Sequence, residues 1–294
     1  MVTDGTTPTP GPITGPSEAA LQVRRLLSRI GFYLFIVIVG AYFALPMLWL
    51  VFAPFDPHPT LAAAVPSSVT LSNFSDLLKN PNALRSLVNS IVLAGATMVL
   101  VVAAAAPAAY ALSRVRIPGR DLLLYVLLLF SSVVTGTAAM VPLFLLVFNL
   151  GLINTDVGVV LVLAGGLMPA GIFILKDFVD SMPKSYEESA RVFGASSFQI
   201  LRDIVLPYAR PGLAVIAVWV VVNVWSNFLI PFILIRDPGL MPAAVVVYNF
   251  YTEGGQADLR LLSSFGLLYS IPVVVMYLFV NRRYGFRFYG GIKG

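Results

Sequence analysis

The sequence contains no cysteine and a single histidine among its 294 residues, and charged residues make up only 11% of it. The absence of cysteine excludes a disulfide framework, a thiolate metal site and a thiol nucleophile. His58 is the sole histidine, so the HExxH motif cannot occur. The GxSxG motif is also absent. The chain also lacks a Gly-Lys dipeptide, which excludes a Walker A loop. We therefore expect no catalytic residue, metal or cofactor here, and any ATP to be bound by another chain.

Apolar residues dominate what is present: 58% of the chain is hydrophobic and the mean hydropathy is +0.88. A helix needs roughly 20 apolar residues to cross about 30 Å of hydrocarbon. The sequence therefore predicts an all-α, multi-pass integral protein of the plasma or inner membrane. Residues 1–23 are rich in Thr, Pro and Gly and are predicted to form a disordered cytoplasmic tail, followed by a transmembrane domain over residues 24–294. Six transmembrane helices are predicted: Ile30–Phe52, Leu87–Leu112, Leu122–Phe148, Val157–Leu175, Gly212–Ile235 and Leu262–Val280.

The distribution of basic residues predicts which side of the membrane each loop faces. Of the 19 Lys and Arg residues, four fall in loops on one side of the six spans: Lys79, Arg85, Arg236 and Arg260. The other fifteen fall on the opposite side. Loops rich in Lys and Arg stay in the cytoplasm, so both termini are predicted to be cytoplasmic. The same rule accounts for the sequence pI of about 9.5, and we expect no nucleic acid partner.

A polar segment, Lys184–Pro207, interrupts the apolar sequence between spans four and five, on the cytoplasmic side. Its spacing predicts two capping boxes, Ser185 with Glu188 and Ser196 with Gln199. Gly194 suits the left-handed position that closes a helix, and Pro207 is expected to end the second one. The pattern favours a helix–turn–helix elbow at the membrane surface. The alternative is a plain interfacial loop that packs under the bundle.

This segment resembles the EAA motif of ABC importer permeases, which reads E-A-A, three residues, G, nine residues, I-x-L-P. The matching positions are Glu188-Ser189-Ala190, Gly194 and Ile204-Val205-Leu206-Pro207, with Ser189 in place of Ala. Residues 30 to 294 resemble the maltose-type carbohydrate permeases, in particular the second subunit of the pair. Three stretches carry this likeness: "NSIVLAGATMVLVVAAAAPAAYALSRVRIPGR", "VPLFLLVFNLGLINT" and "FVDSMPKSYEESARVFGAS". Two stretches depart from the family: Trp225-Ser226-Asn227-Phe228 and the tail "RRYGFRFYGGIKG".

The resemblance implies a permease subunit of an ATP-driven importer that carries a carbohydrate delivered by an extracytoplasmic solute-binding protein. It also implies a second homologous permease subunit and two ABC ATPase subunits that bind ATP and Mg, all within membrane lipid. The elbow would be the coupling helix, and Glu188 would face a basic residue of the ATPase. The expected coupling residues are Glu187, Glu188, Ser189, Ala190, Gly194, Ala195, Ile204, Leu206 and Pro207.

Polar residues near the middle of spans three and five are candidates for a substrate path. They are Ser131, Ser132, Thr135 and Thr137 in span three, and Asn223, Ser226 and Asn227 in span five. They either hydrogen-bond helix to helix or line a cavity. In the second case they would bind a hydroxyl-rich solute, and Trp225 would offer a stacking surface for a sugar ring.

The sequence is also compatible with other classes of membrane protein. None of the six predicted spans contains Asp, Glu, Lys, Arg or His. This argues against an ion-coupled secondary transporter, because such carriers commonly place one of these residues inside the bilayer. An exporter-type or purely structural subunit is a further alternative. Within the importer permeases, the solute could instead be a glycerol phosphate derivative, an amino acid or a peptide.

Overall fold

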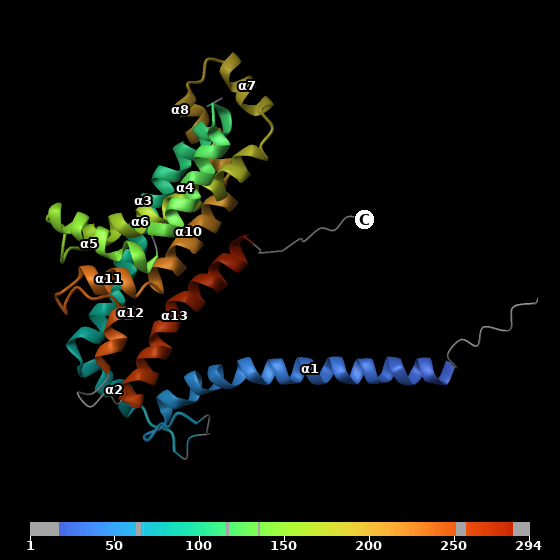
Figure 1. Ribbon diagram of the computed structural model, residues 1–294, viewed down its shortest axis with the longest axis vertical. Helices are drawn as coiled ribbons and strands as arrows, with labels where there is room; N and C mark the ends of the chain where they lie inside the picture. The colour runs from blue at the N-terminus through green and yellow to red at the C-terminus, as the bar shows by residue number, and fades with distance from the viewer. Residues whose placement is uncertain are drawn as a thin grey trace, which may run out of the picture.

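The computed structural model describes residues 18–62, 66, 68–115, 118–134, 136–250 and 257–284, and these residues form helices and no β-strand. Figure 1 shows an elongated bundle with the polar elbow at one end. Four helices are long and apolar enough to cross a membrane: Leu26–Phe55, Pro81–Arg114, Asp156–Asp180 and Leu259–Arg282. A bent pair, Ser197–Tyr208 with Arg210–Trp225, makes a fifth if counted as one span. The all-helical membrane fold is confirmed, but the predicted third and fifth spans are not continuous helices.

Three helices form the core of the bundle. They are α3 (Pro81–Arg114), α6 (Asp156–Asp180) and α10 (Arg210–Trp225), which lie side by side in Figure 1. Small residues let them approach closely: Ala105 and Ala109 of α3 are fully buried, and a Cβ on Gly171 of α6 would lie 3.1 Å from a Val101 methyl group. Close packing of this kind holds helices together in lipid, where there is little hydrophobic drive for helices to associate.

The predicted third span, Leu122–Phe148, is broken in the middle. It consists of α4 (Arg120–Val134), a 3-10 turn (Thr137–Ala139) and α5 (Met140–Asn149). Gly136, expected to permit a break, precedes the turn in an extended conformation with φ −77° and ψ 155°. The apolar pattern continues through the break, so hydropathy alone could not locate it.

The predicted fifth span, Gly212–Ile235, is also wrong as a single helix. α10 ends at Trp225, and a short helix, α11 (Leu229–Leu234), follows. Asn227 Oδ1 accepts a hydrogen bond of 3.1 Å from the backbone N–H of Ile230, so its side chain satisfies a free donor at the start of α11. Side chains of this type favour helix ends over helix interiors, which explains the break.

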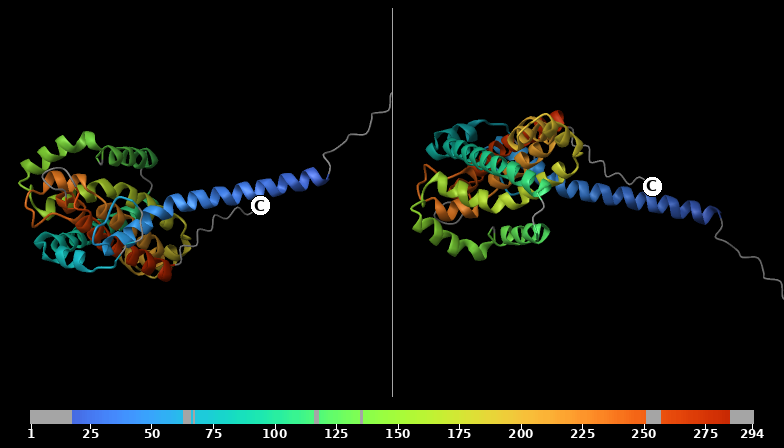
Figure 2. Two further views of the ribbon diagram at one scale, coloured as in Figure 1. Left: turned by 90° about the horizontal axis from the view of Figure 1, so that it is seen from below. Right: turned by 90° about the horizontal axis from the view of Figure 1, so that it is seen from above.

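The first helix, α1 (Glu18–Phe52), extends away from the bundle, as Figures 1 and 2 show. It contacts the rest of the chain near its C-terminal end, through the 3-10 turn Ala53–Phe55 and through α13 (Leu259–Tyr284). α1 begins before the predicted boundary at residue 24, so the last residues of the predicted tail are helical. The remaining part of that tail, residues 1–17, lies outside the described residues.

A second, smaller core closes the end of the bundle opposite the elbow. It is built from α2 (Ser72–Lys79), α12 (Ala243–Val246) and the 3-10 turn Val247–Phe250, packed on α3 and α13. Leu77 and Phe265 are its most buried large side chains. This core anchors the loop that follows α11.

Candidate coupling elbow and membrane cavity

The elbow begins with α7 (Ser185–Val192), and its start differs from the sequence prediction. Lys184 is the N-cap residue and has helical angles, φ −63° and ψ −23°, without a capping side chain. Ser185 is therefore already inside the helix, and the predicted Ser185–Glu188 capping box is absent. A capping side chain works from a residue with extended backbone angles, and no such residue stands here.

Gly194 closes α7 as predicted. Its φ is +83°, which is the left-handed region that L side chains disfavour. The Gly194 N–H donates to Arg191 O at 3.0 Å, and the Ala195 N–H donates to Ala190 O at 3.1 Å. These two bonds form a Schellman motif, which turns the chain sharply at the tip of the molecule.

The second arm of the elbow starts at α8 (Ser197–Ile200). The predicted capping box is confirmed, because Ser196 Oγ accepts from the Gln199 N–H and the Gln199 side chain accepts from the Ser196 N–H. A π-helical turn, Leu201–Val205, leads into α9 (Leu206–Tyr208), so Pro207 lies within the helical run and does not end it. The wide turn lacks the α-helical hydrogen bond with which a proline would clash. The chain then bends by 76° into α10.

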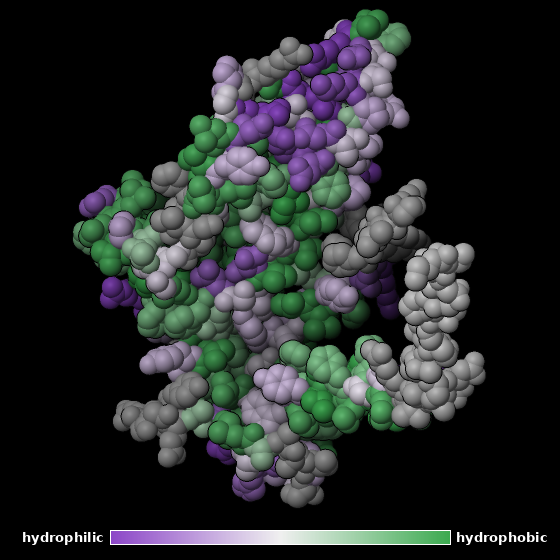
Figure 3. Space-filling model, turned by 45° about the vertical axis from the view of Figure 1, so that its right-hand side comes forward, coloured by the Kyte–Doolittle hydropathy of each residue, from purple (hydrophilic) through white to green (hydrophobic). Residues whose placement is uncertain are grey.

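Apolar side chains cover the tip of the elbow. Phe193 is 91% exposed and Val192 is 84% exposed, and Phe198 of the second arm is also exposed. Figure 3 shows this apolar tip beyond a strongly hydrophilic zone of the surface. Isolated exposed apolar residues are ordinary, but a cluster at the end of a projection is typical of a protein–protein contact.

The predicted coupling residues fall into three groups. Glu188, Ser189 and Gly194 are exposed. Ala190, Ala195, Ile204 and Leu206 are partly buried against the core, and Pro207 is half-buried. Glu187 is buried, with 4% of its surface exposed. The elbow thus has an outer face around Glu188 and an inner face that packs on the bundle.

Glu187 has partners that the sequence analysis missed. Arg114 Nε donates to Glu187 Oε1 at 2.6 Å, and Tyr110 OH donates to Glu187 Oε2 at 3.2 Å. The two side chains of this ion pair are 9% and 5% exposed. In the sequence, Arg114 indicates only which side of the membrane its loop faces. No local pattern links it to Glu187, which is 73 positions away.

A cavity of 330 Å³ lies between α4, α6, α10 and α11. Three of the predicted path residues line it together: Ser131, Asn223 and Asn227. The other lining residues are Leu128, Leu163, Gly166, Leu167, Ala170, Trp219 and Ile230. Asn223 Nδ2 donates to Trp219 O at 2.8 Å. The cavity therefore brings spans three and five together at their polar positions.

Other predicted path residues lie elsewhere. Trp225 is 4% exposed and stacks on Tyr269 of α13 with ring centroids 5.4 Å apart, so it offers no face to a solute. Ser226 Oγ bonds to its own helix at Val222 O, and Thr137 is exposed in the 3-10 turn. Trp225, Ser226 and Thr137 do not line the cavity, and their part in a substrate path stays a prediction. Thr135 and the side chain of Ser132 lie outside the described part of the structure.

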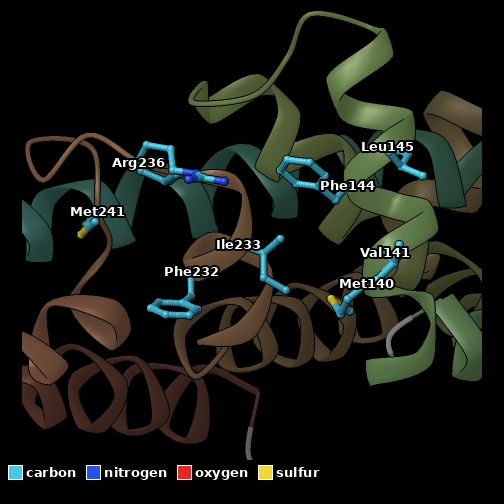
Figure 4. Close-up of a pocket in the computed structure, with 9 residues that line it drawn as sticks. Met140, Val141, Phe144, Leu145, Phe232, Ile233, Arg236 and Met241 are labelled. Carbon is cyan, nitrogen blue, oxygen red and sulfur yellow. The ribbon is translucent and has the colours of Figure 1, made fainter.

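A larger pocket of 630 Å³ opens between α5 and α11 (Figure 4). Its lining is apolar except for Arg236, which lies near Phe144 in this view. It presents no hydroxyl or amide side chain. A hydroxyl-rich solute needs several polar partners, so the smaller cavity fits such a solute better.

The fold and the site define an integral membrane protein with a projecting polar elbow and an internal cavity between broken helices. Residues 119–286 match the sequence family described as "binding-protein-dependent transport system inner membrane component". The chain belongs to this family, and it is a transport component of the inner membrane, not an enzyme.

Two curated relatives and one solved structure illustrate the likeness. The galactooligosaccharides transport system permease protein GanQ of Bacillus subtilis is 29% identical over 271 residues, 90% of this chain and 95% of that protein. The trehalose transport system permease protein SugB of Mycobacterium tuberculosis is 29% identical over 84% of this chain and 90% of that protein. A bacterial ABC transporter that imports the acidic polysaccharide alginate matches with a TM-score of 0.76 and 21% identity, over 92% of this chain and 99% of that chain. This structural likeness supports the fold.

Gly194→Val is expected to open the Schellman turn, because a β-branched residue in the left-handed region costs on the order of 1–3 kcal/mol. A Cβ at this position meets no atom within 4 Å, so the effect comes from backbone strain and not from a clash. Hydrogen exchange at the amides of residues 194 and 195 should accelerate in the variant. Gly194→Asn is the matched control and should stay near the wild type, because Asn tolerates this region. Equal protection in the wild type and in Gly194→Val would contradict the assigned turn.

Proposed function

We propose that this chain is the permease subunit of an ATP-driven importer and that it translocates a carbohydrate received from an extracytoplasmic solute-binding protein. The elbow is the observation that carries the proposal. It projects from the bundle, exposes Glu188 and an apolar tip, and is turned by Gly194. Because the chain has no Walker A loop of its own, the energy of ATP has to enter from a separate ATPase, and the elbow is the surface suited to receive it.

The proposed topology has six spans with both termini in the cytoplasm. The four long helices and the bent pair account for five spans, and α4, the 3-10 turn and α5 together form the sixth. The charge distribution supports this orientation: Arg114, Lys176 and Arg191 lie at the elbow end, whereas Lys79 and Arg85 lie at the opposite end beside α2. In this orientation, the basic residues at the elbow end lie on the cytoplasmic side, around the proposed contact with the ATPase.

A second, homologous permease subunit is proposed to cover α1 and the open faces of the bundle. None of the apolar window of α1 is buried within this chain. Lipid can cover part of such a helix, but a helix that diverges from its own bundle is also available to a neighbouring one. GanQ is named as the permease protein of a transport system, and the alginate structure is named as an ABC transporter.

The carbohydrate substrate is supported by two observations. The relatives named above are galactooligosaccharide and trehalose permeases. The cavity between the broken helices also offers the amide side chains of Asn223 and Asn227 and the hydroxyl of Ser131, which are suited to sugar hydroxyls. We propose that a sugar passes this cavity and bonds to Asn223, Asn227 and Ser131 in transit. A glycerol phosphate derivative would need a cation for its phosphate, and the cavity lining contains none.

Uptake is expected to require ATP and a separate ATPase that contacts Glu188. Glu188→Lys places a positive charge against the basic residue expected on the ATPase, and an interfacial charge mismatch costs about 2–5 kcal/mol. Co-purification of the ATPase with Glu188→Lys should therefore fall, while membrane insertion is unchanged because the spans are untouched. Asp203→Lys, another exposed acidic residue of the elbow region, is the matched control for added charge. Uptake by the chain without an ATPase, driven by a proton or sodium gradient, would refute the proposal.

Replacing Asn223 and Asn227 together by Leu should reduce or alter solute uptake, because the cavity loses its two amide side chains. Ser226→Ala, three positions from Asn223 but outside the cavity, is the matched control. Uptake of a labelled disaccharide is measured together with assembly and with ATPase activity stimulated by the binding protein. Lost uptake with intact assembly supports the path. Unchanged uptake and selectivity would assign these residues to helix packing and helix capping alone.

A further inference from the structure

Two adjacent glutamates of α7 face opposite ways. Glu188 is exposed, whereas Glu187 is buried. Consecutive residues of an α-helix are separated by about 100° around the axis, so one of the pair can face a partner while the other faces the bundle. The exposed glutamate is the one proposed to meet the ATPase. The buried one therefore needs a different explanation.

Both carboxylate oxygens of Glu187 are bound by α3. Arg114 donates to one oxygen at 2.6 Å and Tyr110 donates to the other at 3.2 Å. These donors are four residues apart on one face of α3, and the carboxylate of α7 lies between them. The elbow is thus joined to the cytoplasmic end of a core helix by a charged, buried contact, which is stronger than a bond between neutral groups.

Arg114 also binds the end of α6. Its Nη2 atom donates to Val179 O at 3.0 Å and to Met182 O at 3.2 Å. The last carbonyl groups of a helix lack intrahelical donors, so these bonds hold Arg114 in place even without Glu187. Changing Glu187 therefore removes the carboxylate contact between α7 and α3, leaving the bond between Tyr110 and Arg191 of α7 and the junction of α3 with α6 in place.

The opposite end of α3 holds the outer loop. Asn89 Nδ2 donates to Gly239 O at 2.9 Å and to Met241 O at 3.1 Å, and the Ala243 N–H donates to Ser90 Oγ at 2.8 Å. This loop follows α11 at the end of the molecule away from the elbow. One helix of 34 residues, with Pro107 in its interior, therefore bonds to the elbow at one end and to the outer loop at the other. The proline removes one helical hydrogen bond, but the helix is not broken there.

We propose that Glu187, Tyr110 and Arg114 lock the elbow to α3, so that α3 acts as a rigid rod that carries displacement between the elbow and the outer loop. Glu187 is a positioning residue in this scheme and touches neither ATP nor solute. The inference rests on the proposed function, because it takes the outer face of the elbow as the place where the ATPase acts. Separating the pair would leave a charge buried without its partner, which is strongly unfavourable, so the elbow and α3 are expected to move together.

The absence of cysteine in the chain allows a direct test. Val115 follows the last residue of α3 and Tyr186 lies in the first turn of α7, and both side chains are exposed. Spin labels are placed on Val115→Cys and Tyr186→Cys, away from the apolar tip, and pulsed EPR measures their separation in the assembled transporter, without nucleotide and with a non-hydrolysable ATP analogue. The distance should be the same in both states. A distance that shifts with nucleotide would overturn the proposal whatever the variants do.

Glu187→Gln keeps the shape of the side chain and removes its charge. The variant should still co-purify with the ATPase, but the label distance distribution should broaden and solute uptake per ATP should fall about tenfold, because a buried pair without one charge holds its elements weakly. Glu188→Gln is the matched control and should leave the label distance unchanged while weakening ATPase binding. Wild-type uptake per ATP in Glu187→Gln would overturn the role of the pair. If Glu187→Gln does not assemble, Tyr110→Phe is used instead, because it removes one hydrogen-bond donor without changing the charge. It should broaden the label distance distribution less than Glu187→Gln. A distribution and an uptake per ATP equal to the wild type would contradict the proposed lock.

The outer end of the rod is tested separately. Asn89→Leu should leave the label distance and ATPase binding unchanged but reduce the stimulation of ATPase activity by the loaded binding protein. Undiminished stimulation would remove the outer loop from the scheme. Failure of the proposed function has a different signature, because Glu188→Lys would then retain the ATPase regardless of the label distances.

Discussion

The backbone in hydrocarbon has to satisfy its own hydrogen bonds, and this constraint governs where the chain can break a helix. Two apolar stretches are interrupted, one near Gly136 and one at Ser226–Phe228. Free backbone groups at such breaks cannot face lipid and are tolerated where protein or a polar cavity surrounds them. The cavity lined by Asn223 and Asn227 lies beside the second break. The polar interior of this protein is thus a consequence of its broken helices as much as of its side chains.

The elbow combines two kinds of interaction on its two faces. The inner face is held by the buried carboxylate of Glu187 and by small apolar residues that pack on the core. The outer face keeps Glu188 and aromatic side chains exposed. An interface that forms and separates repeatedly needs a rigid support behind it, since a flexible one would lose ordering entropy at each contact. The turn at Gly194 and the capping box at Ser196 supply part of that rigidity.

Local patterns predicted the turn at Gly194 and the Ser196–Gln199 box but not the start of α7, and several other failures came from long-range contacts. Gly194 and the Ser196–Gln199 box were predictable because each depends on residues within one turn. Pro207 was misjudged because the preceding π-helical turn leaves no sequence signature of its own. Trp225 bonds to and stacks on Tyr269, 44 residues away, a contact that no local pattern predicts. The Glu187–Arg114 pair was missed for the same reason. The cavity was partly predictable, because polar residues in apolar spans are few and have to meet one another.

The exposed tip of the elbow also bears on how the protein is made in the cell. Phe193 and Val192 present apolar surface that nothing in this chain covers, and surface of this kind is typical of a contact with another protein. A permease synthesised in excess of its ATPase would carry that surface uncovered, where it is open to proteases and to self-association. Under the proposed function, balanced synthesis of this chain and of its ATPase would keep this surface covered, and the abundance of the chain should follow the abundance of that ATPase.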